Sequence, residues 1–197
     1  MKILVNVFHP HLESSSVNAA WISELRRTEK TTINNTYANY PDLHIDVARE
    51  QKLLLEHDRI VFQYPFYWYS SPSLMKKWID DVLTLNWAYG PEGTALHGKD
   101  WISAISTGGK HSDYQAGGSH NYSISEFMKP VQQTAILVGM NYLPPYVFHD
   151  ALKSSDLRVT QSAKKYLLHI TKDGLKPSAP NENYHIDDCE ICSPLRH

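Results

Sequence analysis

The chain has 197 residues, of which 42% are hydrophobic and 20% are charged, and its formal net charge at pH 7 is -2. This length and composition predict one globular domain with a single substantial core. Because the net charge is close to zero and the Lys and Arg residues are scattered, the sequence lacks the basic patch of a nucleic-acid-binding protein.

Short apolar runs alternate with amphipathic stretches along the whole chain. The apolar runs predict five strands, at residues 2–8, 31–37, 59–64, 101–106 and 142–148. The amphipathic stretches predict five helices, at residues 17–27, 46–56, 73–83, 124–138 and 155–171. We expect Ser73 to cap the third helix and Pro130 to lie in the first turns of the fourth or to kink it. Two prolines in the last strand favour an edge position for it.

Strands that alternate with helices predict an α/β fold, with a mostly parallel sheet and helices on both faces. We expect the doubly wound, flavodoxin-like order 2-1-3-4-5. In this order the loops at residues 9–16, 65–70 and 107–120 converge on one crevice, at the topological switch between the first and third strands. Residues 1–174 would form this domain. Residues 175–197, rich in Pro, Asn and Asp, would form an extended tail.

The loop after the first strand ends in three consecutive serines, Ser14, Ser15 and Ser16, at the start of the first helix. Hydroxyl groups, free backbone N–H groups and the positive end of a helix together suit a phosphate group. The loop has neither the glycines of a dinucleotide fingerprint nor the Gly-Lys pair of a P-loop. Ordinary N-capping by one serine is the alternative, and it explains one of the three hydroxyls.

Aromatic residues follow the third strand. Pro65 has no backbone donor and ends the strand, which leaves Phe66, Trp68 and Tyr69 on a loop at the carboxyl edge of the sheet. Ligands bind at that edge in α/β proteins, and these rings would form a wall against a planar ligand. The alternative is that they pack as part of the core.

A glycine-containing loop follows the fourth strand, with the sequence Ser106, Thr107, Gly108, Gly109. The glycines allow backbone amides to approach a ligand closely, although they also suit a plain turn. A phosphate site, an aromatic wall and an amide loop at one sheet edge together match what flavin mononucleotide (FMN) requires.

These motifs, together with Tyr114 and His120, make the sequence similar to the NAD(P)H:quinone oxidoreductase family of flavodoxin-like flavoproteins. The resemblance extends over residues 2–171 and includes residues 50–52 and 88–99. It is closest to the bacterial branch, which includes ancillary proteins of glutathione-regulated potassium efflux. The resemblance implies a flavin-dependent enzyme that oxidises NAD(P)H and reduces a quinone-like acceptor by two-electron, ping-pong hydride transfer. The alternative that it implies is a flavin-bearing regulatory subunit of a potassium efflux transporter.

The resemblance also implies a role for each site residue. The flavin phosphate and ribityl chain would be held by His9, Ser15, Ser16, Val17 and Asn18. The flavin ring would contact Pro65, Phe66, Trp68 and Tyr69, and its pyrimidine edge would lie along Thr107, Gly108 and Gly109. Tyr114 and His120 correspond to a pair that supplies or relays a proton, and Tyr89 to an aromatic residue that borders the substrate cavity. For the pair, a packing tyrosine and a solvated histidine are the alternative.

The C-terminal tail bears on the cofactor, because longer family members use a C-terminal region to help hold FAD. This chain ends in an unrelated short tail, which favours FMN and leaves FAD open. The tail contains Cys189 and Cys192, flanked by His185 and His197. Four such ligands could bind zinc, but a single Cys-x-x-Cys is a weak signal, so we expect reducible thiols and no metal site.

Three further expectations concern location and assembly. The N-terminus lacks a signal peptide, no apolar run is long enough to span a membrane, and the two cysteines are not the basis of the fold. We therefore expect a cytoplasmic protein, which as a transporter subunit would lie at the inner face of the membrane. Family members complete each cleft with a neighbouring subunit, so we also expect a homodimer.

Overall fold

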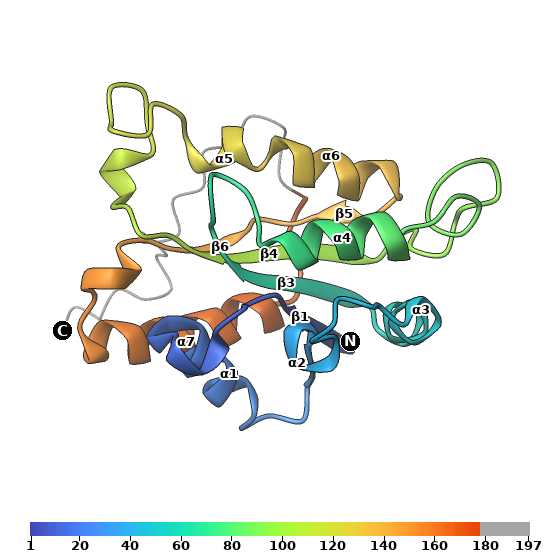
Figure 1. Cartoon of the computed structure of the whole chain (residues 1–197), viewed down its shortest axis with the longest axis horizontal. Coiled ribbons are helices and arrows are strands. Elements are labelled where there is room, and N and C mark those ends of the chain that lie inside the picture. The colour runs from blue at the N-terminus through green and yellow to red at the C-terminus, as the bar shows by residue number, and fades with distance from the viewer. Residues whose placement is uncertain (178–197) are drawn as a thin grey trace.

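The structure is a computed structural model that describes residues 1–177 of the chain. A central sheet is covered by helices on both faces (Figure 1). The predictions for the tail, including those for Cys189 and Cys192, lie outside the described residues. Within residues 1–177, no helix is both long and apolar enough to cross a membrane. The same residues contain no group of three or more His, Cys, Asp and Glu side chains that could hold a metal ion.

Within residues 1–177 the sheet has six strands, and all of their pairings are parallel. The strands are β1 (Ile3–Val7), β2 (Thr31–Asn35), β3 (Arg59–Pro65), β4 (Asp100–Ser106), β5 (Asn141–Tyr142) and β6 (Tyr146–Phe148). Their order is β2-β1-β3-β4-β5, with β6 also paired to β4, which confirms the predicted flavodoxin-like order. The parallel register brings the carboxyl ends of β1, β3 and β4 to one edge of the sheet.

The predicted strand at residues 142–148 is present as two short pieces. Both β5 and β6 pair with β4, and residues 143–145 between them include Pro144 and Pro145. A proline has no N–H to donate, so strand pairing is interrupted there. Neither piece pairs with any other described strand, and the predicted edge position is therefore confirmed.

The described residues form seven α-helices. They are α1 (Ser16–Leu25), α2 (Thr36–Asn39), α3 (Val47–Glu56), α4 (Ser73–Val82), α5 (Ile124–Phe127), α6 (Lys129–Leu137) and α7 (Asp156–Thr171). Four of the predicted helices correspond to α1, α3, α4 and α7, with ends that differ by at most two residues. The predicted helix at residues 124–138 is divided at Met128 into α5 and α6. Pro130 lies in the first turn of α6, where its missing N–H has no intrahelical acceptor to lose.

Two helix starts differ from the sequence prediction. The prediction that Ser73 caps α4 is wrong, because Pro72 occupies the cap position without a side-chain hydrogen bond and Ser73 is the first helical residue. The short helix α2 was not predicted from the sequence. It begins where the Asn35 side chain accepts a hydrogen bond from the Ala38 backbone, which satisfies one of the free donors of a helix start.

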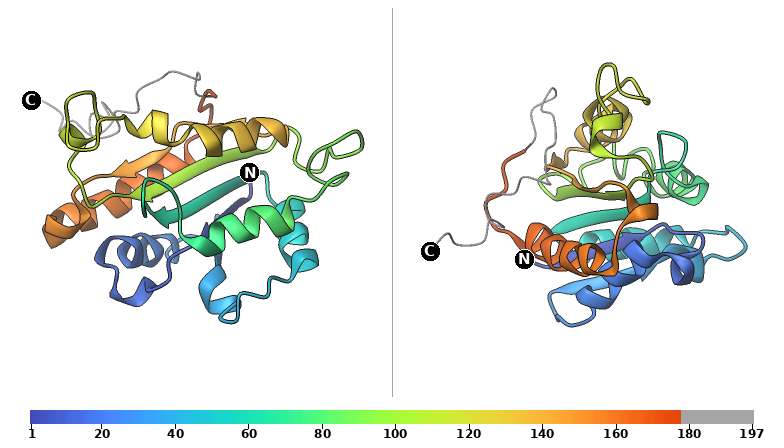
Figure 2. Two further views of the ribbon diagram at one scale, coloured as in Figure 1. Left: turned by 45° about the horizontal axis from the view of Figure 1, so that its top comes forward. Right: turned by 90° about the vertical axis from the view of Figure 1, so that its left-hand side faces the viewer.

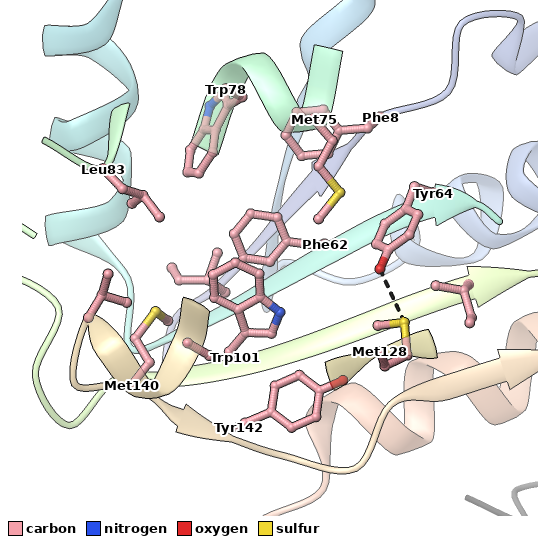
Figure 3. Packing of buried hydrophobic residues seen from close by; sticks show 14 of the residues in the cluster. Phe8, Phe62, Tyr64, Met75, Trp78, Leu83, Trp101, Met128, Met140 and Tyr142 are labelled. Atoms are coloured by element: carbon pink, nitrogen blue, oxygen red, sulfur yellow. Dashed lines mark hydrogen bonds between the residues drawn. The ribbon is translucent and has the colours of Figure 1, made fainter. Parts of the chain in front are cut away.

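Helices lie on opposite faces of the sheet (Figure 2). Two apolar cores, one on each face, hold them there. On the face covered by α3, α4, α5 and α6, Phe62 stacks on Trp101 with ring centroids 3.9 Å apart and meets Trp78 edge-on (Figure 3). On the face covered by α1 and α7, Trp21 packs against Tyr146 with ring centroids 5.3 Å apart. All seven residues of β3 are buried between these cores, so the loop after β3 starts from a fixed point.

Glu50 on α3 is a fully buried carboxylate that joins several elements. It accepts hydrogen bonds from Asn34 on β2 (2.7 Å), from Tyr40 after α2 (2.6 Å) and from Trp78 on α4 (2.8 Å), and it pairs with Arg49. These bonds replace the water that the carboxylate loses on burial. Glu50 on α3 therefore links β2, the end of α2 and α4 through hydrogen bonds to one carboxylate.

Replacing Glu50 with Gln should lower the free energy of unfolding by about 3 kcal/mol, because an amide cannot accept from all of these donors. Glu56→Gln is the matched control: Glu56 is exposed on the same helix, and its replacement should change stability by less than about 0.5 kcal/mol. Urea denaturation followed by circular dichroism measures both values. Equal stabilities for the two variants would contradict the anchoring role of Glu50.

Candidate functional site

The loops at the carboxyl edge of the sheet enclose a cavity of ≈ 450 Å³. This volume falls within the range of small-molecule sites. The cavity is lined by His9, His11, Ser14, Ser15, Ser16, Val17, Asn18, Pro65, Phe66, Tyr67, Ser106, Thr107, Gly108, Ala151 and Leu152. The structure thus brings together residues that the sequence analysis had placed on three separate loops.

The three serines have different local positions. Ser15 caps α1, and its Oγ accepts hydrogen bonds from the backbone N–H and the side-chain amide of Asn18, both at 3.2 Å. Ser14 lies in the short 3-10 helix η1 (Leu12–Ser14) and donates to the carbonyl oxygen of His11 at 3.0 Å. Ser16 is the first residue of α1 and is exposed at the cavity. N-capping thus accounts for Ser15, and the start of α1 opens onto the cavity.

His9 provides a neutral hydrogen-bond donor at the end of β1. Burial, together with the nearby His11, lowers the pKa of His9 to about 4, so the ring is uncharged at pH 7. Its Nδ1 accepts a hydrogen bond from the His11 backbone N–H at 3.1 Å. Since Nδ1 is the acceptor, the single proton of the neutral ring is on Nε2. His9 can therefore donate to an anion without carrying a charge.

The aromatic loop combines core packing with an exposed rim. Phe66 is half-buried and packs edge-on against Tyr114 and Phe127, and it also lines both cavities of the site. Trp68 is 90% exposed. Trp68 and Tyr69 have φ values of 50° and 60°, and Ser70 N–H donates to the Tyr67 carbonyl at 2.9 Å. This is the geometry of a type I′ turn, which bulky residues rarely adopt.

A second cavity of ≈ 230 Å³ adjoins the first and shares Phe66 and Gly108 with it. Its lining consists of Phe66, Trp68, Tyr69, Gly108, Gly109, Tyr114 and His120. The two glycines of its wall differ. A Cβ atom at Gly109 would lie 2.8 Å from His120 Nε2, whereas a Cβ at Gly108 would meet only Leu152, at 3.6 Å. A side chain at Gly109 would displace His120, so that glycine serves close packing.

Tyr114 and His120 form a stacked pair in the wall of the second cavity, with ring centroids 4.4 Å apart. Burial raises the pKa of the Tyr114 phenol, and interactions with the Thr107 side chain and the Gly109 backbone oppose that rise. The Tyr69 hydroxyl lies 3.3 Å from His120 Nδ1. The pair therefore has a protonated phenol next to an imidazole, and the imidazole is half-exposed.

Tyr89 is not part of either cavity. It lies in the connection between α4 and β4, next to Leu85, and is 36% exposed. That connection leads into the amino end of β4, which is the opposite edge of the parallel sheet from the cavities (Figure 1). Within one chain, Tyr89 therefore does not meet the other candidate residues.

One part of the site was not predicted from the sequence, namely the segment that follows β6. Asp150 N–H donates to the Gly109 carbonyl and Ala151 N–H to the Thr107 carbonyl, both at 2.9 Å. His149 is buried, and its Nδ1 lies 3.1 Å from Thr107 Oγ1. The signal that points to this segment is its place after a fifth parallel strand, because that strand ends at the same sheet edge as the other three.

Comparison with known proteins gives relatives over most of the chain. A family model described as a flavodoxin-like fold matches residues 1–170. YrkL of Bacillus subtilis (strain 168), named an uncharacterized NAD(P)H oxidoreductase, is 52% identical over 170 residues, which are 86% of this chain and 98% of YrkL.

Two solved structures are similar in both fold and sequence. The general stress protein 14 of Treponema denticola, solved in complex with FMN, is 39% identical with a TM-score of 0.83, and the match covers 86% of this chain and 98% of that one. A protein of P. pentosaceus named NADPH-quinone reductase is 32% identical with a TM-score of 0.81. That match covers 88% of this chain and the whole of the other, 100%.

Lowering the pH from 7 to 5 should destabilise the fold through His9. Because the pKa of His9 in the folded chain lies below its ordinary value of 6.5, the unfolded chain binds more protons in this range. The contribution of His9 is present above pH 6.5 and is lost as the pH falls towards 4. It should amount to about 1 kcal/mol between pH 7 and pH 5, after allowance for solvent screening.

The measurement is urea denaturation of the parent and of His9→Asn at both pH values. The variant should lose less stability on acidification than the parent does. His169, whose pKa is also lowered by burial, contributes equally to both proteins and cancels in the comparison. An identical loss in parent and variant would show that His9 is not the depressed group.

Proposed function

Because the chain belongs to the flavodoxin-like family, whose model matches residues 1–170, we propose that it is a flavin-dependent NAD(P)H oxidoreductase. In this proposal NAD(P)H and a quinone or similar acceptor react in turn at one site, by two-electron, ping-pong hydride transfer. The observation that carries the proposal is that the two cavities adjoin and share Phe66 and Gly108 in their lining. One begins at the start of α1 beside the neutral donor His9, and the other ends at Tyr114 and His120.

The relatives support this class of reaction. YrkL is named an NAD(P)H oxidoreductase, and the P. pentosaceus protein is named an NADPH-quinone reductase. The T. denticola protein was solved with FMN, which supports FMN as the flavin of this chain.

The first cavity fits the phosphate end of FMN. The residues that line it include no Lys or Arg, so an anion there would be held by neutral donors and by the positive end of α1. His9 would donate from Nε2, and the backbone N–H groups at the start of α1 would supply further donors. Ser16, at the mouth of the helix, would add a hydroxyl.

The second cavity fits a planar ring. Phe66, Trp68 and Tyr69 contribute aromatic surface to its lining, and Gly108 contributes backbone without a side chain. A bound flavin would supply a ring system that accepts a hydride and passes on two electrons. Backbone N–H groups of the Gly108 loop would stabilise negative charge at the edge of such a ring.

Tyr114 and His120 would manage the proton that accompanies hydride transfer. Burial keeps the Tyr114 phenol protonated at neutral pH, so it is available as a hydrogen-bond donor or an acid. His120, stacked on the phenol and half-exposed, would return a proton from solvent. Tyr69, which contacts His120 Nδ1, would hold the imidazole in place.

We further propose a homodimer. Tyr89 lies at the opposite edge of the sheet from the cavities, so it would border a substrate cavity only if it came from a second copy of the chain. Trp68 and Leu152 at the rim of the site are 90% and 87% exposed, and apolar surface of this kind favours association. The transporter subunit, the cytoplasmic location and the domain boundary at residue 174 stay predictions.

The purified chain should bind one FMN, turn yellow and lose that colour on addition of NADPH or NADH. Ser16→Asp should weaken FMN binding at least tenfold, because a carboxylate would face the phosphate while favouring the start of α1. Riboflavin, which has no phosphate, should be affected less. Ser73→Asp is the matched control, since Ser73 is likewise the exposed first residue of a helix and lies outside both cavities.

Fluorescence titration of each flavin gives the dissociation constants, and thermal denaturation verifies that both variants fold. A parent protein that binds neither FMN nor FAD would end the proposal. Equal FMN affinities for Ser16→Asp and Ser73→Asp would contradict the proposal that the FMN phosphate binds at the start of α1.

Tyr114→Phe and His120→Gln should slow flavin reduction by NAD(P)H tenfold to a hundredfold, because each removes a proton donor next to the ring. The flavin content of both variants should change little. Tyr122→Phe, which removes an exposed phenol from the same loop, is the control and should react as the parent does. Stopped-flow absorbance measures the reductive step. If flavin is reduced as fast in Tyr114→Phe and His120→Gln as in the parent, the two residues have a structural role only.

A further inference from the structure

His149 is a buried histidine for which the proposed function has no role. It follows β6, is 3% exposed and lies against the loop that carries the two glycines of the site. Its ring centroid is 5.6 Å from that of Tyr114 and 5.2 Å from that of His111. The Thr107 hydroxyl connects it to the site, with Thr107 Oγ1 3.1 Å from His149 Nδ1.

The hydrogen bonds of Thr107 define one arrangement in which His149 is the donor. Thr107 Oγ1 lies 2.9 Å from the carbonyl oxygen of Gly109, which can only accept. When the single hydroxyl proton of Thr107 points to that carbonyl, the contact with His149 is satisfied if His149 Nδ1–H donates to Thr107. In this tautomer, His149 is a donor to the oxygen of Thr107.

The Thr107 side chain and the Gly109 backbone both act to lower the pKa of Tyr114, whose ring centroid lies 5.6 Å from that of His149. If Tyr114 gives up its proton, its oxygen becomes a strong acceptor, and the Thr107 hydroxyl can turn towards it. The Gly109 carbonyl would then keep the hydrogen bond from Asp150 N–H at 2.9 Å, so no buried acceptor would be left unpaired. A chain of donors results, from His149 through Thr107 to Tyr114, in which each bond strengthens the next.

We propose that His149 has the Nδ1–H tautomer and is a positioning residue for Tyr114, and that through Thr107 it stabilises the phenolate that remains after Tyr114 donates its proton. The inference rests on the proposed function for the acid role of Tyr114, whereas the donor chain consists of protein groups alone. The proton would leave the phenol for the reacting site and be replaced from solvent through His120. Without these hydrogen-bond donors, a buried phenol would be a poor acid.

Other groups near Tyr114 also affect the ionisation of its phenol. Burial disfavours the phenolate most, and the nearby Tyr69 and Asp113 disfavour it as well. His120 and His149 face the ring of Tyr114 directly, while His111 is in contact with His149. A test must therefore change His149 and Thr107 while leaving the other groups in place.

The test is an ionisation measurement on the full chain without flavin. Tyr114 is replaced by 3-fluorotyrosine, whose phenol ionises at lower pH and whose ¹⁹F resonance reports the fraction of phenolate. His149→Leu and Thr107→Val should each lower the acid ionisation constant of this phenol about tenfold. His149→Asn should restore it, because an asparagine amide can donate from the place of Nδ1, and Thr107→Ser should behave as the parent does. Circular dichroism verifies folding.

The double variant His149→Leu/Thr107→Val should differ little from either single variant, because both act through one chain. Additive effects, or equal ionisation in His149→Leu and the parent, would overturn the inference, as would an asparagine variant that behaves like the leucine one. Should His149→Leu fail to fold, the comparison of Thr107→Val with Thr107→Ser decides instead. A lower ionisation constant in Thr107→Val than in Thr107→Ser supports the series of hydrogen bonds from His149 to Tyr114, and equal constants refute it.

Failure of this inference and failure of the proposed function are distinguishable. A chain that binds no flavin but gives the expected ionisation constants refutes the proposed function and leaves the donor chain intact. A chain that binds FMN and is reduced by NAD(P)H, while all variants ionise alike, refutes the donor chain only. In the flavin-loaded protein, His149→Leu should slow reduction about tenfold and shift its pH profile upwards, with KM for NAD(P)H unchanged.

Discussion

The geometry of the whole site depends on the hydrogen bonds of the Asn18 side-chain amide. Buried in the first turn of α1, its nitrogen donates to Ser15 Oγ at 3.2 Å and to Ser106 Oγ at 3.0 Å, and its oxygen accepts from Gln63 Nε2 at 3.2 Å. Only a side chain that both donates and accepts can make all three bonds. The start of α1 and the ends of β3 and β4 are thereby held together by one residue, and the two cavities keep a fixed relation to each other.

The fold was largely predictable because its signals are local. Each buried strand is a short apolar run, and each long helix has one apolar face, so the alternation along the chain determines the class of sheet. The features that were not predicted depend on contacts or on single residues. The division at Met128, the short helix capped by Asn35 and the two-piece edge strand around Pro144 each change hydrogen bonding without changing the apolar pattern.

The candidate site was predictable only where residues of a functional type are adjacent in sequence. The serines, the aromatic loop and the glycine loop each stand out in the sequence, and the sheet brings them together. His149 follows an ordinary apolar strand, and its importance comes from Thr107, 42 positions earlier in the chain. Tyr89 shows the reverse case, since it stands in a motif of the family and yet lies at the other edge of the sheet.

The left-handed turn at Trp68 and Tyr69 makes Trp68 a fluorescence probe of the second cavity. Trp21, Trp78 and Trp101 are completely buried and Trp87 is half-buried, whereas Trp68 stands in water at the mouth of the second cavity. In a single chain its indole emission should therefore lie at longer wavelength than that of the buried indoles and be the most accessible to collisional quenchers. A planar molecule that stacked on this ring would quench the red edge of the spectrum selectively, so occupancy of the site can be followed by intrinsic fluorescence without any label.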